Sequence, residues 1–209
     1  MTYIIKEECI KCKLLDCVEQ LIGENIIFHY SKLNMKPPRV GSVVEWHQDL
    51  TYYPLTNQDS VTVSIYLDKA TIENGCLQII KKSHVHGINN HTKNGIFQGK
   101  VMEKVDEDDV EFLEASAGTV IFMHCMSLHS STKNKSKKSR RTLLMSYRAA
   151  DAYPIYSKMT KNTEATIRLV RGMQTNVARF SFESFPIPNF KNEVKSLYDI
   201  QKDSRENRI

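Results

Sequence analysis

Short runs of β-branched and other apolar residues, separated by turn residues, most constrain the fold of this 209-residue chain. The clearest run is SVTVSIYL at residues 60–67, and shorter ones lie at 25–29, 43–50, 76–80, 118–123 and 141–147. Runs this short, with turn chemistry such as Glu73-Asn74-Gly75 between them, are typical of antiparallel sandwiches and barrels. We therefore predict a mainly β fold with flanking helices, built as one antiparallel sandwich or barrel with a cavity between its sheets.

Two stretches are predicted to be helical. Residues 7–23 have an amphipathic pattern, with Ile10, Leu14, Leu15, Val18 and Leu21 on one side. The polar tail from about residue 189 has weaker helical spacing and is expected at the surface. KLNMKPP (32–38) is expected to break regular structure because of its two prolines, and residues 83–99 and 106–115 are expected to be irregular. Since no repeat or linker divides the chain, residues 1–209 are predicted to form one domain.

Composition excludes several protein classes. A hydrophobic share of 41% with 25% charged residues is that of an ordinary globular protein, and no apolar run approaches the roughly 20 residues of a membrane span. The N-terminus lacks the apolar core of a signal peptide, so we expect an intracellular, cytoplasmic protein.

The net charge of +5 is concentrated at 133–141. This patch could bind nucleic acid, lipid or a small acidic ligand, but it has no interleaved aromatic residues, which disfavours nucleic acid. The oligomeric state cannot be predicted.

The five cysteines do not form a recognisable metal motif. Cys9 and Cys12 form a CxxC followed by Cys17, but a structural zinc site needs four ligands and no second CxxC exists. We predict that the cysteines are reduced, and that Cys76 and Cys125 are small core residues.

WHQDLTYYP (46–54) places His47 and Asp49 two residues apart, which fits either half of a metal site or a polar kink in a strand. Among the other histidines, His124 and His129 end an apolar run that leads into a polar turn. An HxD pair with a distant histidine makes a 2-His-1-carboxylate set, which binds Fe(II) and leaves three positions open. Arg140 follows His129 by 11 residues, and its guanidinium is suited to a carboxylate.

The chain resembles the phytanoyl-CoA dioxygenase family of Fe(II)/2-oxoglutarate-dependent oxygenases. The resemblance rests on WHQDLTYYP (46–54), DKATIENGCLQIIKKSHVHG (68–87) and AGTVIFMHCMSLHSSTKNKSKKSRRTLLMSYRAAD (117–151), which cover most of residues 25–175. It implies a double-stranded β-helix (jelly-roll, cupin-like) core. It also implies a dioxygenase that uses Fe(II), 2-oxoglutarate and O2 to hydroxylate a small organic substrate, releasing succinate and CO2. The alternatives are a catalytically silent relative that binds metal or 2-oxoglutarate, and a structural β-protein whose HxD is accidental.

The resemblance assigns roles to individual residues. It implies that His47, Asp49 and His129 bind the iron, with His129 preferred over His124 because Arg140 then lies at +11. It also implies that Arg140 binds the distal carboxylate of 2-oxoglutarate and that the hydroxyl of Ser131 assists Arg140. Gln48 is a weaker candidate for a contact with the cosubstrate. The neighbouring lysines (133, 135, 137 and 138) are then expected in solvent, with Arg141 on the opposite side of the strand from Arg140. An aspartate at 49 favours hydroxylation, since related halogenases have a small residue there.

Substrate contacts are predicted less directly. Tyr52, Tyr53, Tyr147 and Arg148 are candidate pocket residues. Arg168 and Arg171 resemble a family segment that could meet an anionic substrate group, the alternative being a surface helix or a tail packed on the barrel. The chain departs from the family in a shorter part before His47, in Lys81-Lys82 where Pro-Gly is usual, and in Ser64 where several members have a tryptophan that lines the cosubstrate pocket. No residue pattern identifies the substrate.

Overall fold

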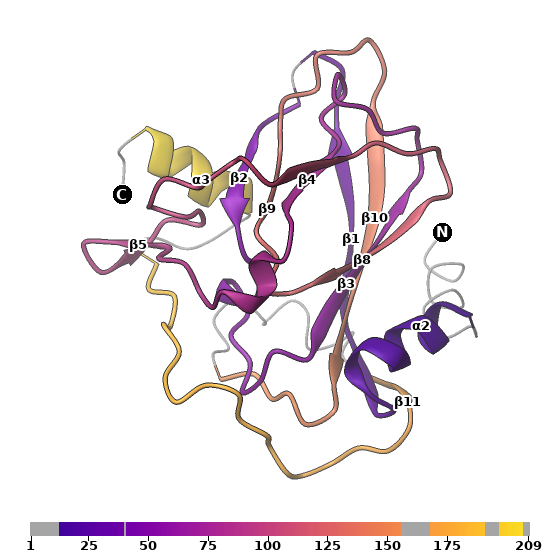
Figure 1. The fold of residues 1–209 in the computed structure, drawn as a ribbon, viewed down its shortest axis with the longest axis vertical. Helices are drawn as coiled ribbons and strands as arrows, with labels where there is room; N and C mark the ends of the chain where they lie inside the picture. The colour runs from indigo at the N-terminus through magenta and orange to yellow at the C-terminus, as the bar shows by residue number, and fades with distance from the viewer. Residues whose placement is uncertain (1–12, 40, 156–167, 191–196, 207–209) are drawn as a thin grey trace.

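Two antiparallel sheets form the core of the computed structural model, which describes residues 13–39, 41–155, 168–190 and 197–206 (Figure 1). The larger sheet has the order β11 (Arg168–Arg171), β1 (Ile26–Lys36), β10 (Arg140–Ala149), β3 (Ser60–Tyr66), β8 (Val120–His124). The smaller has the order β2 (Val44–His47), β9 (His129–Ser131), β4 (Leu77–Ile80), β7 (Val110–Leu113), and β5 (Thr92–Lys93) pairs with β6 (Ile96–Phe97). The predicted mainly β, jelly-roll fold is confirmed.

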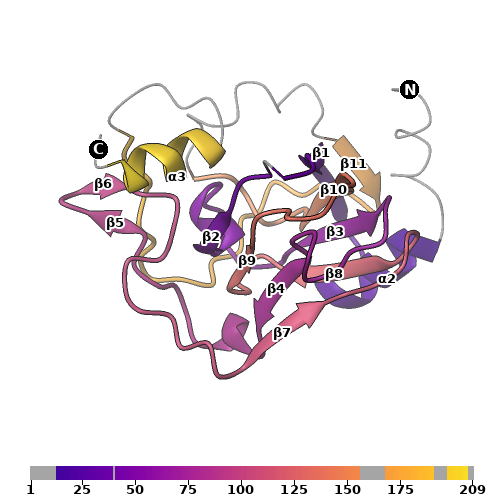
Figure 2. The same cartoon turned by 90° about the horizontal axis from the view of Figure 1, so that it is seen from above.

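Two α-helices lie on opposite sides of the sheets in both views (Figures 1 and 2). Helix α2 (Lys13–Ile22) packs against the large sheet through Leu15, Val18 and Ile22, whose burial stabilises the fold by about 1.5–3 kcal/mol each. This confirms the described part of the helix predicted at 7–23, although Leu21, which was predicted on its apolar side, is exposed and Ile22 is buried instead. Helix α3 (Leu197–Arg205) confirms the helical tail. Two 3-10 turns, η1 (Asp49–Thr51) and η2 (Ser83–Val85), complete the helical structure of the described residues.

Strand β1 is longer than expected and changes phase at His29. The predicted break at KLNMKPP was wrong, because β10 pairs with β1 as far as Lys36, opposite Arg140. A register shift between Phe28 and Tyr30 makes His29 a β-bulge. Phe28 therefore packs in the core under α2. After the bulge, the alternate residues Tyr30, Lys32 and Asn34 face the space between the sheets.

Helix α3 brings the end of the chain onto β2. The Gln201 side chain accepts a hydrogen bond from the backbone N–H of Glu45 (3.0 Å) and donates one to the carbonyl of Gly99 (2.7 Å). Ile200 is buried in a second core cluster with Leu50. These contacts place the first turn of α3 at the edge of the space between the sheets.

The turn at Glu73-Asn74-Gly75 packs closely against the loop between β9 and β10. Gly75 has φ +75°, and a Cβ at this position would collide with the carbonyl oxygen of Thr132. Only glycine allows this approach without strain, which accounts for the glycine of the ENGCL turn. Strand β7 lies in a stretch predicted to be irregular, because its pairing with β4 outweighs its acidic composition.

Three cysteines lie in the described residues, and all three are free. Cys76 and Cys125 are buried, as predicted, and Cys17 is exposed. The CxxC at residues 9–12 lies outside the described residues. No helix in the described part of the chain is long and apolar enough to span a membrane.

Candidate functional site

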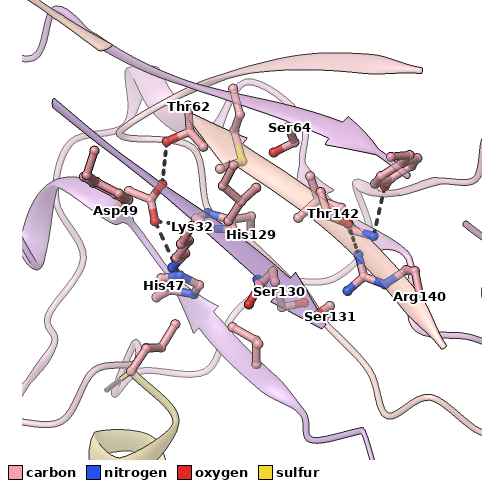
Figure 3. A pocket seen from close by; sticks show the side chains of 18 residues that line it. Lys32, His47, Asp49, Thr62, Ser64, His129, Ser130, Ser131, Arg140 and Thr142 are labelled. Carbon is pink, nitrogen blue, oxygen red and sulfur yellow. Dashed lines mark hydrogen bonds and ion pairs between the residues drawn. The ribbon is translucent and has the colours of Figure 1, made fainter. Parts of the chain in front are cut away.

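A cavity with about 610 Å³ of empty space, including the part open to solvent, lies between the two sheets (Figure 3). Its walls come from β1, β3, β8 and β10 on one side and β2, β4 and β9 on the other, with Leu197 of α3 at the edge. His47, Asp49 and His129 line one region and Arg140 another. The predicted cavity between sheets is therefore present.

His47, Asp49 and His129 converge in this cavity. The Nε2 atoms of His47 and His129 lie 3.6 and 3.5 Å from Asp49 Oδ1, and one donor atom from each residue falls within 4.8 Å of the others. Antiparallel pairing of β2 with β9 sets His47 directly opposite His129. Within the described residues, this is the one group of three or more histidine, cysteine or acidic side chains with such spacing.

Backbone carbonyls orient both imidazole rings. His47 Nδ1 lies 2.8 Å from the carbonyl oxygen of Glu45, and His129 Nδ1 lies 3.0 Å from that of Ser127. A carbonyl oxygen can only accept, so each Nδ1 carries the proton and each Nε2 presents a lone pair toward Asp49. This second interaction of the ring is typical of metal-binding histidines.

The same local environment keeps Asp49 ionised. Thr62 on β3 donates a hydrogen bond to Oδ2 (3.0 Å), which leaves Oδ1 turned toward the histidines. Burial alone would raise the pKa of Asp49, but His129, His47 and the nearby Lys32 outweigh it and hold this pKa well below its usual range. Burial, with His47 beside it, lowers the pKa of His129 to about 4. At neutral pH the carboxylate is charged and His129 is neutral, which are the forms that bind metals.

Gln48, the middle residue of the HxD, points away from this cavity. Its side-chain amide donates to the carbonyls of Gly87 (2.8 Å) and Met126 (2.9 Å), and its side-chain oxygen accepts from the N–H of Asn89. The extended backbone of Gln48 (φ −119°, ψ 128°) explains the difference, because it puts residues 47 and 49 on one face and 48 on the other. The structure therefore does not bring Gln48 to the cosubstrate region. Its amide instead holds the HxD segment in place, together with His91, which accepts from the Gln48 N–H.

Arg140 is a buried cation without an anionic partner. Only 5% of the residue is exposed, and Nη1 donates to the Thr142 hydroxyl at 3.0 Å. Nε has no hydrogen-bond partner, and no acidic side chain of the described residues forms an ion pair with this guanidinium. Desolvation lowers the pKa of Arg140, as expected for a charge removed from water. A buried, unpaired guanidinium is an incomplete site that a carboxylate would complete.

The surroundings of Arg140 fit the expected pattern in part. Ser131 lines the cavity beside it, although the hydroxyl that the guanidinium contacts is that of Thr142. Ser64 also lines the cavity, as its place in the family pattern suggests. The four turn lysines are exposed, and Arg141 faces outward, where it pairs with Asp68 (2.7 Å), as predicted.

The predicted substrate residues Tyr53, Arg148 and Arg171 are not part of the cavity wall. Tyr53 is buried against His29, with ring centroids 5.1 Å apart, and Arg148 donates to the carbonyl of Ala152. Arg171 lies on edge strand β11, where it pairs with Asp16 (2.8 Å) and Glu19 on α2.

Three further candidates also lie elsewhere. Tyr52 donates to the carbonyl of Gly99, Tyr147 is in the core under α2, and Arg168 lies over the Phe28 ring. The alternative interpretation, a surface helix or a tail packed on the barrel, also differs from the structure, in which Arg168 begins strand β11.

Sequence reasoning missed the contribution of β1 to the cavity. Tyr30, Lys32 and Asn34 all line it, together with Thr62 and Thr142 from β3 and β10. The signal was present as three polar residues at alternate positions. It was obscured by the expectation that the prolines at 37 and 38 disrupt the whole KLNMKPP segment.

Comparison with known proteins supports the same grouping. The model of the phytanoyl-CoA dioxygenase (PhyH) family matches residues 4–142. A probable alpha-ketoglutarate-dependent hypophosphite dioxygenase from Stutzerimonas stutzeri is 38% identical over 150 residues, which cover 68% of this chain and 52% of that protein. A methylphosphonate hydroxylase from Gimesia maris is 33% identical over 137 residues, covering 66% of this chain and 51% of that protein. The chain thus spans about half the length of these relatives.

A solved structure also resembles the fold. The apo form of the non-heme monooxygenase ThoJ gives a TM-score of 0.65 at 23% identity, covering 93% of this chain and 74% of that one. At this identity the likeness shows the fold alone, and it agrees with the jelly-roll arrangement of the two sheets.

Proposed function

The chain belongs to the phytanoyl-CoA dioxygenase family, and on this premise we propose that it is an Fe(II)- and 2-oxoglutarate-dependent dioxygenase that hydroxylates a small organic substrate. The observation that carries the proposal is the convergence of His47, Asp49 and His129 in one cavity with both Nε2 atoms turned toward Asp49. Two imidazoles and one carboxylate on one face are the donor set of non-heme Fe(II) oxygenases.

The proposed cosubstrate fits the remaining cavity. Arg140 is buried and lacks an anionic partner, so the distal carboxylate of 2-oxoglutarate would supply the charge and the acceptors that it needs. The guanidinium donates a hydrogen bond to Thr142, and the small polar side chains of Ser131 and Ser64 line the same cavity. The relatives named as an alpha-ketoglutarate-dependent dioxygenase and a hydroxylase support the same cosubstrate and reaction type.

The bound iron and 2-oxoglutarate would supply the oxidising chemistry, in which O2 is consumed and succinate and CO2 are released. The protein's own residues hold that chemistry in place. Asp49 contributes a fixed negative charge, the carbonyls of Glu45 and Ser127 orient the two imidazoles, and Thr62 sets the rotation of the carboxylate. The presence of Asp49 favours return of a hydroxyl group over halogenation.

The test is succinate release from 2-oxoglutarate by the Fe(II)-loaded protein, which uncoupled turnover reveals even without the substrate. We expect release from the wild type and none above background from His47→Ala or Asp49→Ala. Lys137→Ala, in the exposed turn, is the matched control and should retain the wild-type rate. Release unchanged in Asp49→Ala would refute the site. A wild type that binds Fe(II) and 2-oxoglutarate but releases no succinate would support the catalytically silent alternative.

A further inference from the structure

We propose that the substrate is a small anion and that the ammonium of Lys32 recognises its anionic end. The proposal rests on the proposed function, because it assigns a substrate class to the same cavity. It also assigns a role to a residue that neither the metal set nor the cosubstrate site uses.

Lys32 is placed where a substrate would meet the metal site. It lies on β1 opposite Leu144 of β10, and both side chains line the cavity. Figure 3 shows its side chain beside Asp49 and His129, at a different part of the cavity from Arg140. His47 and His129 are buried, whereas Lys32 keeps accessible surface. Because Lys32 lines the cavity and packed protein around its ammonium lowers its pKa, this accessible surface faces the cavity. An anion bound in the cavity beside the metal set can therefore reach this ammonium.

The ammonium of Lys32 is available to a ligand. No hydrogen bond or ion pair within the described residues engages it, and the opposite charge that acts on it is that of Asp49. Burial lowers the pKa of Lys32 and Asp49 opposes this shift. Lys36, on the same face of β1, differs because its ammonium donates to the carbonyls of Ser42 and Thr132. A lysine with a flexible chain and free donors in the cavity wall can adjust to a small anion bound there.

Charge balance leads to the same conclusion. With iron and 2-oxoglutarate bound, the two positive charges of Fe(II) and the one of Arg140 would equal the negative charges of Asp49 and the dianionic cosubstrate. Lys32 then adds one positive charge that the described cavity residues do not neutralise. A monoanionic substrate would complete the balance in a region of low dielectric, where an unmatched charge is costly.

The anion has to be small. Leu197 closes one edge of the cavity, and the part near Arg140 would be taken by the cosubstrate. Away from Arg140, the cavity wall includes Lys32 and the two histidines, and we place the anion beside them. Short carboxylates and phosphonates fit this description, with the C–H or P–H bond to be oxidised held toward the metal ligands.

The experiment measures binding rather than turnover. The anaerobic protein is loaded with Mn(II), saturated with 2-oxoglutarate so that Arg140 is occupied, and titrated calorimetrically with methylphosphonate, propionate and the neutral propionamide. Variants are Lys32→Met, which keeps the length of the side chain but not its charge, Lys32→Arg, which keeps the charge, and the exposed control Lys137→Met.

We expect methylphosphonate and propionate to bind the wild type, and propionamide to bind at least about 10-fold more weakly. Lys32→Met should raise the Kd of the anions at least about 10-fold, equivalent to about 1.4 kcal/mol, and remove their advantage over propionamide. Lys32→Arg and Lys137→Met should stay within about 3-fold of the wild type. The Kd of 2-oxoglutarate, titrated before the probes, should be unchanged in Lys32→Met, and an unchanged melting temperature would confirm that this variant is folded.

Three results would overturn the proposal. The first is a wild type that binds none of the anions, and the second is a wild type that binds propionamide as well as propionate. The third is a Lys32→Met variant that binds 2-oxoglutarate more weakly but the probes as well as the wild type does. The last result would assign Lys32 to the cosubstrate. A wild type that binds neither Mn(II) nor 2-oxoglutarate would count against the proposed function itself. In that case, anion titration of the metal-free protein and of Lys32→Met would still decide whether Lys32 binds anions.

Discussion

Replacing Arg140 with methionine should have opposite effects on ligand binding and on the stability of the free protein. The residue is 5% exposed, its Nε has no hydrogen-bond partner, and within the described residues its one side-chain hydrogen bond goes to the Thr142 hydroxyl. The free protein therefore carries the cost of a buried charge that the described residues do not compensate. Arg140→Met removes this cost while it keeps most of the side-chain volume.

The magnitude follows from the environment of the guanidinium. Truncating one partner of a buried, hydrogen-bonded charge pair costs about 2–5 kcal/mol, so the Kd of 2-oxoglutarate should rise by about 30- to 3,000-fold. Replacing a buried ionic group with an apolar one of similar volume is often neutral, or stabilising by about 1–4 kcal/mol. The Thr142 hydroxyl loses its donor, which offsets about 1 kcal/mol of any gain. We therefore expect the free energy of unfolding without ligand to change by between about −1 and +3 kcal/mol.

Thermal unfolding with and without 2-oxoglutarate, in the presence of Mn(II), tests both parts. At a ligand concentration of 100 times the wild-type Kd, the wild type gains about 2.7 kcal/mol, or about 5–10 °C for a chain of this size. A variant with a 100-fold weaker Kd gains about 0.4 kcal/mol at the same concentration, or about 1 °C. Lys137→Met is the control, because Lys137 is an exposed residue of the adjacent turn, and it should behave as the wild type.

Two results would refute the reasoning. Retention of the wild-type ligand shift in Arg140→Met would mean that the carboxylate is bound elsewhere. A loss of several kcal/mol from the ligand-free variant would mean that the guanidinium is already well compensated in the free protein.

Three further predictions concern stability. The pKa of buried His29 is lowered to about 4, mainly by burial and then by Arg148, so the unfolded chain binds more protons between pH 6.5 and 4. The free energy of unfolding should therefore decrease as the pH is lowered from 6.5 to 4, by up to about 1.4 kcal/mol per pH unit. Urea unfolding should show a smaller decrease in His29→Phe, whereas the exposed control His86→Phe should behave as the wild type. Lys36→Met should lose about 1–3 kcal/mol, because the Thr132 carbonyl loses its donor, and an unchanged unfolding midpoint would contradict this role. Lys82 has φ +58°, a left-handed conformation that glycine adopts more readily. Thermal unfolding of Lys82→Gly should therefore show a free energy of unfolding higher by up to about 1 kcal/mol. A similar increase in Lys82→Ala would rule out backbone strain as the cause.

Local sequence was sufficient for several features of the site. The extended backbone of Gln48 (φ −119°, ψ 128°), between strand β2 and the turn η1, puts His47 and Asp49 on one face. Strand alternation separates Arg140, which is buried, from Arg141, which pairs with Asp68 at the surface. The lysines between His129 and Arg140 could be assigned to a solvent turn because no apolar periodicity accompanies them.

Only the tertiary structure decided which side chains share the cavity. The opposition of His47 and His129 depends on the register between β2 and β9, which hydrogen bonds between distant segments set. The bulge at His29 turns Tyr30 and Lys32 inward, and the strand holds past the expected break because β10 pairs with it. Leu197 reaches the cavity edge only through the packing of α3 on β2.

The difference has one physical reason. A side chain's direction within its own strand follows from covalent geometry, which the sequence determines locally. Its neighbours across a cavity follow from pairing and packing between segments far apart in the chain. The proposed metal ligands could be predicted because their spacing is local or matches a familiar motif, whereas Lys32 and Thr142 had to be found in the folded protein.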